Sequence, residues 1–141
     1  MGSYADDALF MSRNNIEYVE LISDDGKSKV MVIPAWQGRV MTTSAAGDEG
    51  DSYGWINYSF IKKRQIDLQF NPVGGEERFW LGPEGGVFSL YFRQGEKQIY
   101  KNWKVPPVLD IEAFKIQSQS KNCICLTKEG CLTNACGTTF Y

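Results

Sequence analysis

The residues of this chain best suited to chemistry lie together in the segment 71–86. The segment carries an arginine, a tryptophan and three glutamates, along with five glycines and two prolines. Glycine supplies backbone angles that side chains forbid, and proline fixes φ and removes a hydrogen-bond donor. The segment therefore cannot be a helix or one long regular strand. An irregular backbone that carries an aromatic ring and charges on a rigid scaffold is typical of a binding surface.

Acid–base chemistry in this segment would rest on its carboxylates. The chain has no histidine, which excludes mechanisms that need imidazole as a base or as a metal ligand. Glu76 and Glu77 are adjacent, so on a strand they would point to opposite faces. Only Glu84 with one of them could form a carboxylate pair that acts on a glycan. The sequence leaves open whether the chain is an enzyme.

The cysteines are gathered at the end of the chain. Cys123, Cys125, Cys131 and Cys136 all lie in the last nineteen residues. Their spacing differs from the paired short knuckles of structural zinc sites. On a strand, Cys123 and Cys125 would point to one face as small buried residues. We expect plain thiols and no cofactor, with a zinc site or a disulfide as the alternatives.

Size and composition indicate one globular domain over residues 1–141. The chain is 43% hydrophobic and 23% charged, with a formal net charge of −2. Charges are mixed, with no basic block beyond Lys62-Lys63-Arg64, so nucleic acid is not an expected partner. No apolar run approaches the ~20 residues that span a bilayer. A signal peptide removed before Met1 would imply a periplasmic or extracellular location.

The segments that must position these groups read mostly as strands. Ser3, followed by Asp6 and Asp7, predicts the capped start of one short helix. Asp24-Asp25-Gly26 is a hairpin signal, and Pro34 should end or bulge the strand that contains it. The predicted strands are Ile16–Ile22, Lys29–Trp36, Arg39–Ser44, Val87–Arg93, Ala113–Gln117 and Asn122–Thr127. Short strands joined by turns predict a mainly β fold, an antiparallel β-sandwich with one short N-terminal helix.

Three segments carry a resemblance to a known group of proteins. They are Val32-Ile33-Pro34-Ala35-Trp36-Gln37-Gly38-Arg39-Val40-Met41, Gly54-Trp55-Ile56-Asn57 and the stretch GGEERFWLGPEGG at 74–86. In them the chain resembles an uncharacterised bacterial family of the galactose mutarotase (aldose 1-epimerase)-like superfamily. That resemblance implies an antiparallel β-supersandwich that binds sugars on a concave sheet. Members of the superfamily are longer, so the chain resembles the N-terminal half of such a fold.

The resemblance implies sugar recognition more than catalysis. The epimerases use a histidine acid, which is missing here, and a carboxylate base that would lie in the absent half. Any activity would be aldose-epimerase-like or otherwise act on carbohydrate. The expected ligand-binding residues for a sugar or glycan are Asn71, Glu76, Arg78, Trp80 and Glu84. An aromatic ring can stack on a pyranose, and polar groups can satisfy its hydroxyls.

The alternative is a structural or interaction module without a small-molecule site. In that case Trp36, Trp55, Trp80 and Trp103 are core residues, and Arg39 and Arg78 pair with glutamates. The fold also reads as incomplete, because its last residues are apolar and β-prone. An unfinished sandwich exposes strand edges, so we expect a homo-oligomer formed through exposed sheet edges.

Overall fold

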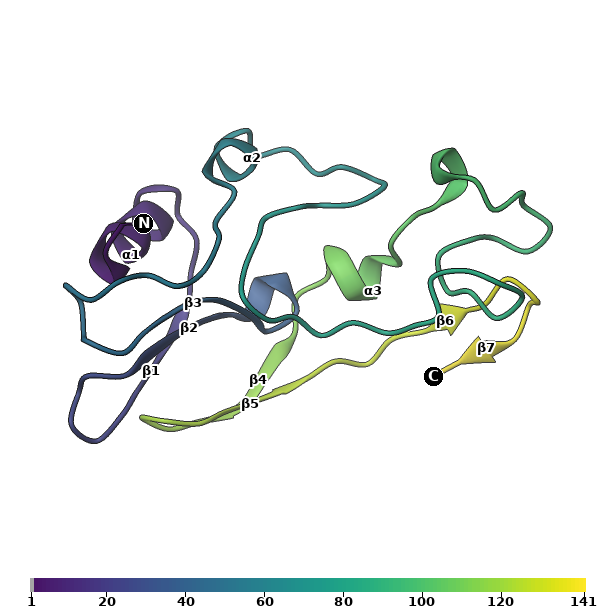
Figure 1. Cartoon of the computed structure of the whole chain (residues 1–141). Coiled ribbons are helices and arrows are strands. Elements are labelled where there is room, and N and C mark those ends of the chain that lie inside the picture. The colour runs from purple at the N-terminus through teal and green to yellow at the C-terminus, as the bar shows by residue number, and fades with distance from the viewer. Residues whose placement is uncertain (1) are drawn as a thin grey trace.

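The computed structural model describes residues 2–141 and confirms a mainly β, antiparallel fold with a short N-terminal helix. Its helices are α1 (Tyr4–Arg13), α2 (Tyr58–Lys62) and α3 (Pro107–Asp110), with 3-10 turns η1 (Pro34–Trp36) and η2 (Tyr100–Asn102). Its strands are β1 (Val19–Ile22), β2 (Lys29–Ile33), β3 (Arg39–Ser44), β4 (Lys115–Gln119), β5 (Ile124–Thr127), β6 (Leu132–Thr133) and β7 (Thr139–Phe140). The molecule is elongated, with α1 near one end and β6–β7 near the other (Figure 1).

Helix α1 begins where the sequence places its cap. The Asp6 N–H donates to Ser3 Oγ at 3.2 Å, and the Ser3 N–H donates to Asp6 Oδ2 at 3.0 Å, which makes a reciprocal capping box. Asp7 is buried, and its carboxylate accepts hydrogen bonds from Ser52 and Tyr58. These bonds tie the helix to the chain that follows the first sheet.

The first sheet has the strand order β1-β2-β3, with both pairs antiparallel. The predicted hairpin at Asp24-Asp25-Gly26 connects β1 to β2. Strand β2 ends before Pro34, as predicted, because proline cannot donate to the ladder and η1 starts there. Strand β3 has the bounds predicted from the sequence.

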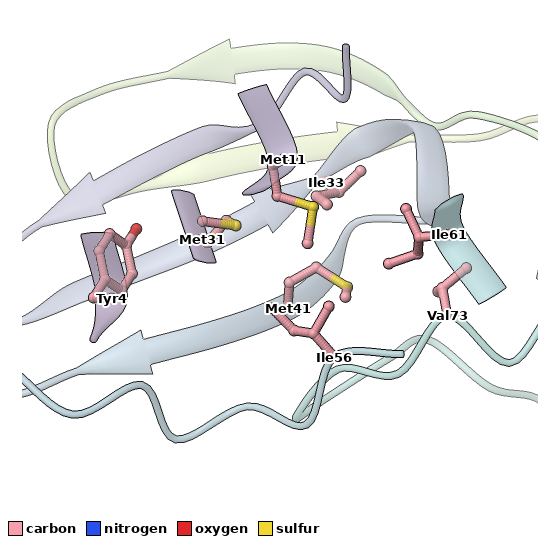
Figure 2. Close-up of a cluster of buried hydrophobic side chains, with 8 residues drawn as sticks. All are labelled: Tyr4, Met11, Met31, Ile33, Met41, Ile56, Ile61 and Val73. Carbon is pink, nitrogen blue, oxygen red and sulfur yellow. The ribbon is translucent and has the colours of Figure 1, made fainter. Parts of the chain in front are cut away.

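The first hydrophobic core lies between this sheet, α1 and α2. Its buried side chains point toward one another in Figure 2. They are Tyr4, Met11, Met31, Ile33, Met41, Ile56, Ile61 and Val73. Flexible methionines fill the irregular space between helix and sheet.

The second core lies farther along the molecule and contains more aromatic residues. Tyr91, Phe92, Val105 and Leu109 are its buried members. The chain continues in two short hairpins, β4–β5 and β6–β7, and Ala135 between β6 and β7 packs against this core. The β4–β5 hairpin is tied to the first sheet, because Ile22 donates to the Lys121 carbonyl at 2.8 Å.

The predicted strand Val87–Arg93 is wrong. The structure has turns and bends there, and Phe88 is 61% exposed while Ser89 is buried. Ser89 Oγ donates to the Glu84 carbonyl and accepts from the Tyr91 N–H. Local side-chain hydrogen bonds thus take the place of a strand ladder, which the alternating apolar pattern alone could not reveal.

Candidate functional site

The segment 71–86 runs between the two cores and is held against the first sheet. The Val40 N–H donates to the Glu77 carbonyl at 3.0 Å, and the Glu76 N–H donates to the Val40 carbonyl at 2.9 Å. Gly75 has a φ of 110°, and a side chain there would meet Arg39 Cδ at 2.9 Å. Only glycine therefore allows the segment to lie this close to β3.

Arg78 leaves this segment toward the second core. Its guanidinium carbon lies 4.1 Å from the centre of the Trp80 ring, within the range of a cation–π contact. One Nη atom lies 3.6 Å from Asp110 Oδ1, and the same atom donates to the Leu109 carbonyl. Burial lowers the pKa of Arg78, although the neighbouring Asp110 carboxylate acts in the opposite direction. The guanidinium is thus internally paired and only 19% of its side chain is exposed.

From Arg78 onward, four aromatic rings lie next to one another. The ring centres of Trp80 and Tyr91 are 5.2 Å apart, and Tyr91 stacks on Trp103 with ring centres 5.7 Å apart and an angle of 6° between the rings. Trp103 in turn stacks on Tyr100 at 6.2 Å and 12°. We call Trp80, Tyr91, Trp103 and Tyr100 the aromatic column. It runs from the half-buried Arg78, paired with the buried Asp110, to Tyr100, which is 78% exposed.

The 3-10 turn η2 explains the outer end of the column. In a 3-10 helix the side chains at positions i and i+3 eclipse each other. Tyr100 and Trp103 are three residues apart across η2, so their rings lie one above the other. The exposed ring is thereby supported by a second ring, which makes it a firm stacking surface.

A surface hollow of about 540 Å³ adjoins this ring. We call it the Tyr100 hollow. It is lined by Glu84, Gly85, Phe92, Gln98, Ile99, Tyr100 and Trp103. Trp80 Nε1 donates to Glu84 Oε1 at 2.9 Å, so the column also fixes this carboxylate. The Gln98 amide accepts from the Gly86 N–H and donates to the Gly86 carbonyl, both at 2.7 Å.

The structure brings together three of the five residues predicted to bind a ligand. Arg78 contacts the Trp80 ring, and Trp80 in turn donates a hydrogen bond to Glu84. Among the residues that line the Tyr100 hollow, however, only Glu84 belongs to the predicted set. Trp80 belongs to the aromatic column and does not line the hollow. Arg78 contacts the inner end of the column through Trp80.

The other two predicted residues point elsewhere. Asn71 is buried, and both its backbone N–H and its side-chain amide donate to Asp110 Oδ2, at 2.9 and 2.7 Å. Asn71 and Asp110 also line a separate pocket of about 250 Å³ near Trp36. Glu76 is exposed and accepts hydrogen bonds from the backbone and hydroxyl of Thr43 on β3.

Sequence reasoning missed Asp110, Gln98 and Tyr100. Asp110 belongs to the four-residue helix α3, which starts at the Pro106-Pro107 pair. Proline at the first helical position was an available signal for that helix. The i, i+3 spacing of Tyr100 and Trp103 was also visible, but it predicts stacking only once η2 is known.

The predicted pairing of the two arginines with glutamates is wrong for Arg78, whose partner is Asp110. Arg39 is 3% exposed, and its Nη1 donates to the Gly74 carbonyl at 2.7 Å. Burial lowers the pKa of Arg39 to about 10, and the nearby Arg78 charge adds to this while Asp110 opposes it. Asp110 forms an ion pair with Arg78, and it acts on Arg39 only through its charge.

The remaining predictions concern tryptophans and cysteines. Trp36, Trp80 and Trp103 are partly buried, but Trp55 is 63% exposed and is not a core residue. Cys123 and Cys125 were expected to be buried, which is wrong. All the cysteines of the chain are free and exposed, and on β5 the partly buried side chains are Ile124 and Leu126, which alternate with the exposed Cys125.

Within residues 2–141, no group of three or more cysteine or acidic side chains is placed to hold a metal ion. Over the same residues, none of the helices has the length and apolar character needed to cross a bilayer.

Comparison with known families matches residues 2–141 to a family described as "Family of unknown function (DUF6786)". No curated protein and no solved structure gives a significant match. Since the family match covers nearly the whole chain, the chain belongs to the DUF6786 family.

Proposed function

We propose that this member of the DUF6786 family binds a carbohydrate in the Tyr100 hollow. The observation that carries the proposal is the exposed Tyr100 ring, supported from behind by Trp103 and flanked by the Glu84 carboxylate. A pyranose has an apolar face that stacks on an aromatic ring and hydroxyls that donate to a carboxylate. Glu84 keeps Oε2 for this purpose, since Oε1 accepts from Trp80.

The proposal includes a distant relationship to the galactose mutarotase-like superfamily. Its support is the resemblance of the three sequence segments, one of which contributes Arg78, Trp80 and Glu84. In this arrangement Arg78 and Trp80 act indirectly. They hold the column that positions the exposed ring and the carboxylate.

We propose binding rather than catalysis by these residues. Acid–base work on a glycan uses two carboxyl groups with different pKa values. Of the residues that line the Tyr100 hollow, Glu84 alone carries a carboxylate. The Tyr91 hydroxyl is buried and donates to the Leu81 carbonyl at 2.6 Å, and burial raises its pKa, so Tyr91 is a poor acid–base partner.

A second candidate function is an interaction module in which the column only packs the core. The observation that favours it is the internal pairing of Arg78 with Asp110 and Leu109. The two candidates differ at Tyr100. A sugar site needs this exposed ring, whereas a packed core does not.

Titration with glucose, galactose and short glycans tests the proposal. We expect saturable changes in tryptophan fluorescence at millimolar sugar, because Trp103 lies beneath Tyr100. Tyr100→Ala should weaken binding about 3- to 10-fold through loss of ring stacking. Glu84→Gln should weaken it about 10-fold through loss of a charged acceptor.

Tyr53→Ala is the matched control, because Tyr53 is also an exposed tyrosine, at 56%, but does not line the hollow. Its N–H donates to the Thr43 carbonyl, which places it beside β3. This variant should titrate like the wild type. No response to any sugar at millimolar concentration, or a Tyr100→Ala variant that binds like the wild type, would favour the interaction module.

A further inference from the structure

We propose that the Tyr100 hollow selects amino sugars, and that Glu84 is the residue that determines this preference. This inference rests on the proposed carbohydrate function and names the class of sugar.

The lining of the hollow carries one formal charge, and that charge is negative. Besides Glu84 the lining consists of a glycine, an amide and apolar or aromatic side chains. Glu84 is exposed, and its Oε1 is occupied by Trp80 while Oε2 faces no partner among the hydrogen bonds of residues 2–141. A protonated amine would supply the missing donor together with the opposite charge.

The Arg78 guanidinium does not cancel this charge. Arg78 contacts Trp80 but does not line the hollow, and its own charge is paired with Asp110 at 3.6 Å. A sugar carboxylate or phosphate would therefore meet Glu84 without a compensating cation. Like charges at short range disfavour binding.

The aromatic walls act in the same direction. The faces of tyrosine and tryptophan attract cations, and an exposed site of this kind adds a modest stabilisation. Trp103 is stacked between Tyr91 and Tyr100, so the face open to a ligand at this hollow is the outer face of Tyr100. An ammonium group beside the sugar ring would thus be attracted by the Glu84 carboxylate and by the Tyr100 ring.

Four cations adjoin the lining residues in sequence and must be considered. They are the exposed Arg93, Lys97, Lys101 and Lys104, which neighbour Phe92, Gln98, Tyr100 and Trp103. None of the four lines the hollow. Salt screens exposed charges, so the influence of these cations on sugar affinity should weaken as the salt concentration rises.

The test compares glucosamine, glucose and glucuronate by calorimetry on the full chain at about 0.1 M salt. At about pH 6 the amine of glucosamine is protonated, and we expect it to bind about 3- to 5-fold more tightly than glucose. Glucuronate should bind more weakly than either. At about pH 9 the amine is neutral and the advantage of glucosamine should disappear.

Glu84→Gln removes the charge but keeps an oxygen that can accept from Trp80, so it should bind glucosamine and glucose equally. Lys101→Gln is the control and should leave the ratio of the two affinities unchanged. Equal wild-type affinities for glucosamine and glucose at the lower pH, or tightest binding of glucuronate, would overturn this inference and leave the carbohydrate function standing. Absence of binding by all three sugars would overturn both.

Discussion

Among single residues, Asp110 has the largest structural role in the site. It is 6% exposed, and its carboxylate accepts from both donors of Asn71 while it pairs with Arg78. Asn71 and Arg78 stand on either side of the Gly74-Gly75 turn. One carboxylate therefore fixes the start of the segment 71–86 and the inner end of the aromatic column.

Asp110→Ala should lower the free energy of unfolding by about 3 kcal/mol. The change removes the counter-ion of Arg78 and the acceptor of the Asn71 N–H, and buried polar groups that lose a partner are costly. Urea denaturation followed by circular dichroism measures the loss.

The control for this variant is Glu112→Ala, which breaks an ion pair of Glu112 with Lys128 at 2.6 Å. That pair is partly exposed, so its loss should cost less than about 1 kcal/mol. Equal effects of the two variants would mean that Asp110 does not anchor the segment.

Gly54 is a second residue with a specific role, here a steric one. An added Cβ would lie 2.0 Å from the Met41 carbonyl oxygen, a backbone atom of β3. We expect Gly54→Ala to destabilise the fold by about 3 kcal/mol, since backbone atoms cannot yield as a flexible side chain does.

Gly85→Ala is the comparison, because its Cβ would meet only Gln98 Oε1, at 3.8 Å. Its melting temperature should stay within a few degrees of the wild type. A Gly54→Ala variant as stable as this one would show that the loop before α2 packs less closely on β3.

The clustering of Arg78, Trp80 and Glu84 could be anticipated from the sequence because they are near neighbours in the chain. The stacking of Tyr91 and Trp103 could not, since it joins segments that only the tertiary fold brings together. The role of Asp110 could not be predicted for the same reason, because it lies 39 positions from Asn71 along the chain.

At the scale of elements, α1 depends on its capping box. Ser3→Ala removes the acceptor for the Asp6 N–H and should cost about 1 kcal/mol. Hydrogen bonding by Ser3, chiefly from its backbone and secondarily from its side chain, holds the pKa of Asp6 below its ordinary value.

This lowered pKa predicts how stability depends on pH. A carboxyl group whose pKa is lower in the folded state stabilises the fold above its unfolded pKa, and this stabilisation is lost as the pH falls through the folded value. The stability difference between wild type and Asp6→Asn should be constant above about pH 5 and shrink below about pH 4. A difference that does not change between pH 7 and pH 3 would contradict the capping role.

The elements that the sequence predicted well are those with local determinants. The cap of α1, the hairpin after β1, the end of β2 at Pro34 and the bounds of β3 each follow from a few neighbouring residues. The failure at Val87–Arg93 has a different origin. Alternating apolar residues form a strand only beside a partner strand. Here the Ala135 N–H donates to the Ser89 carbonyl and the Lys104 N–H donates to the Tyr91 carbonyl. These two bonds come from different segments, so they do not form a ladder.

At the scale of the whole molecule, much apolar surface is left uncovered. Val87, Phe88, Phe140 and Tyr141 are all more than half exposed. Within residues 2–141, β4 and β5 pair only with each other, and a two-stranded ribbon is marginally stable alone. Exposed strand edges of this kind tend to pair with another chain.

We therefore expect concentration-dependent self-association. Sedimentation at micromolar protein should show species larger than the 15.9 kDa chain. Ile116→Lys, at a position on β4 that is 41% exposed, should shift the distribution toward the monomer because charge protects a strand edge. A single monomeric species at all concentrations would contradict this expectation.

The claim on which the functional account rests is that a sugar ring stacks on Tyr100. Saturation-transfer NMR measures this contact directly, because magnetisation passes from the protein to the ligand protons nearest to it. With millimolar glucose or glucosamine, we predict strong transfer to protons on one face of the sugar ring and clear loss of transfer in Tyr100→Ala. Absence of transfer from the wild-type protein, or equal transfer from Tyr100→Ala, would contradict the account.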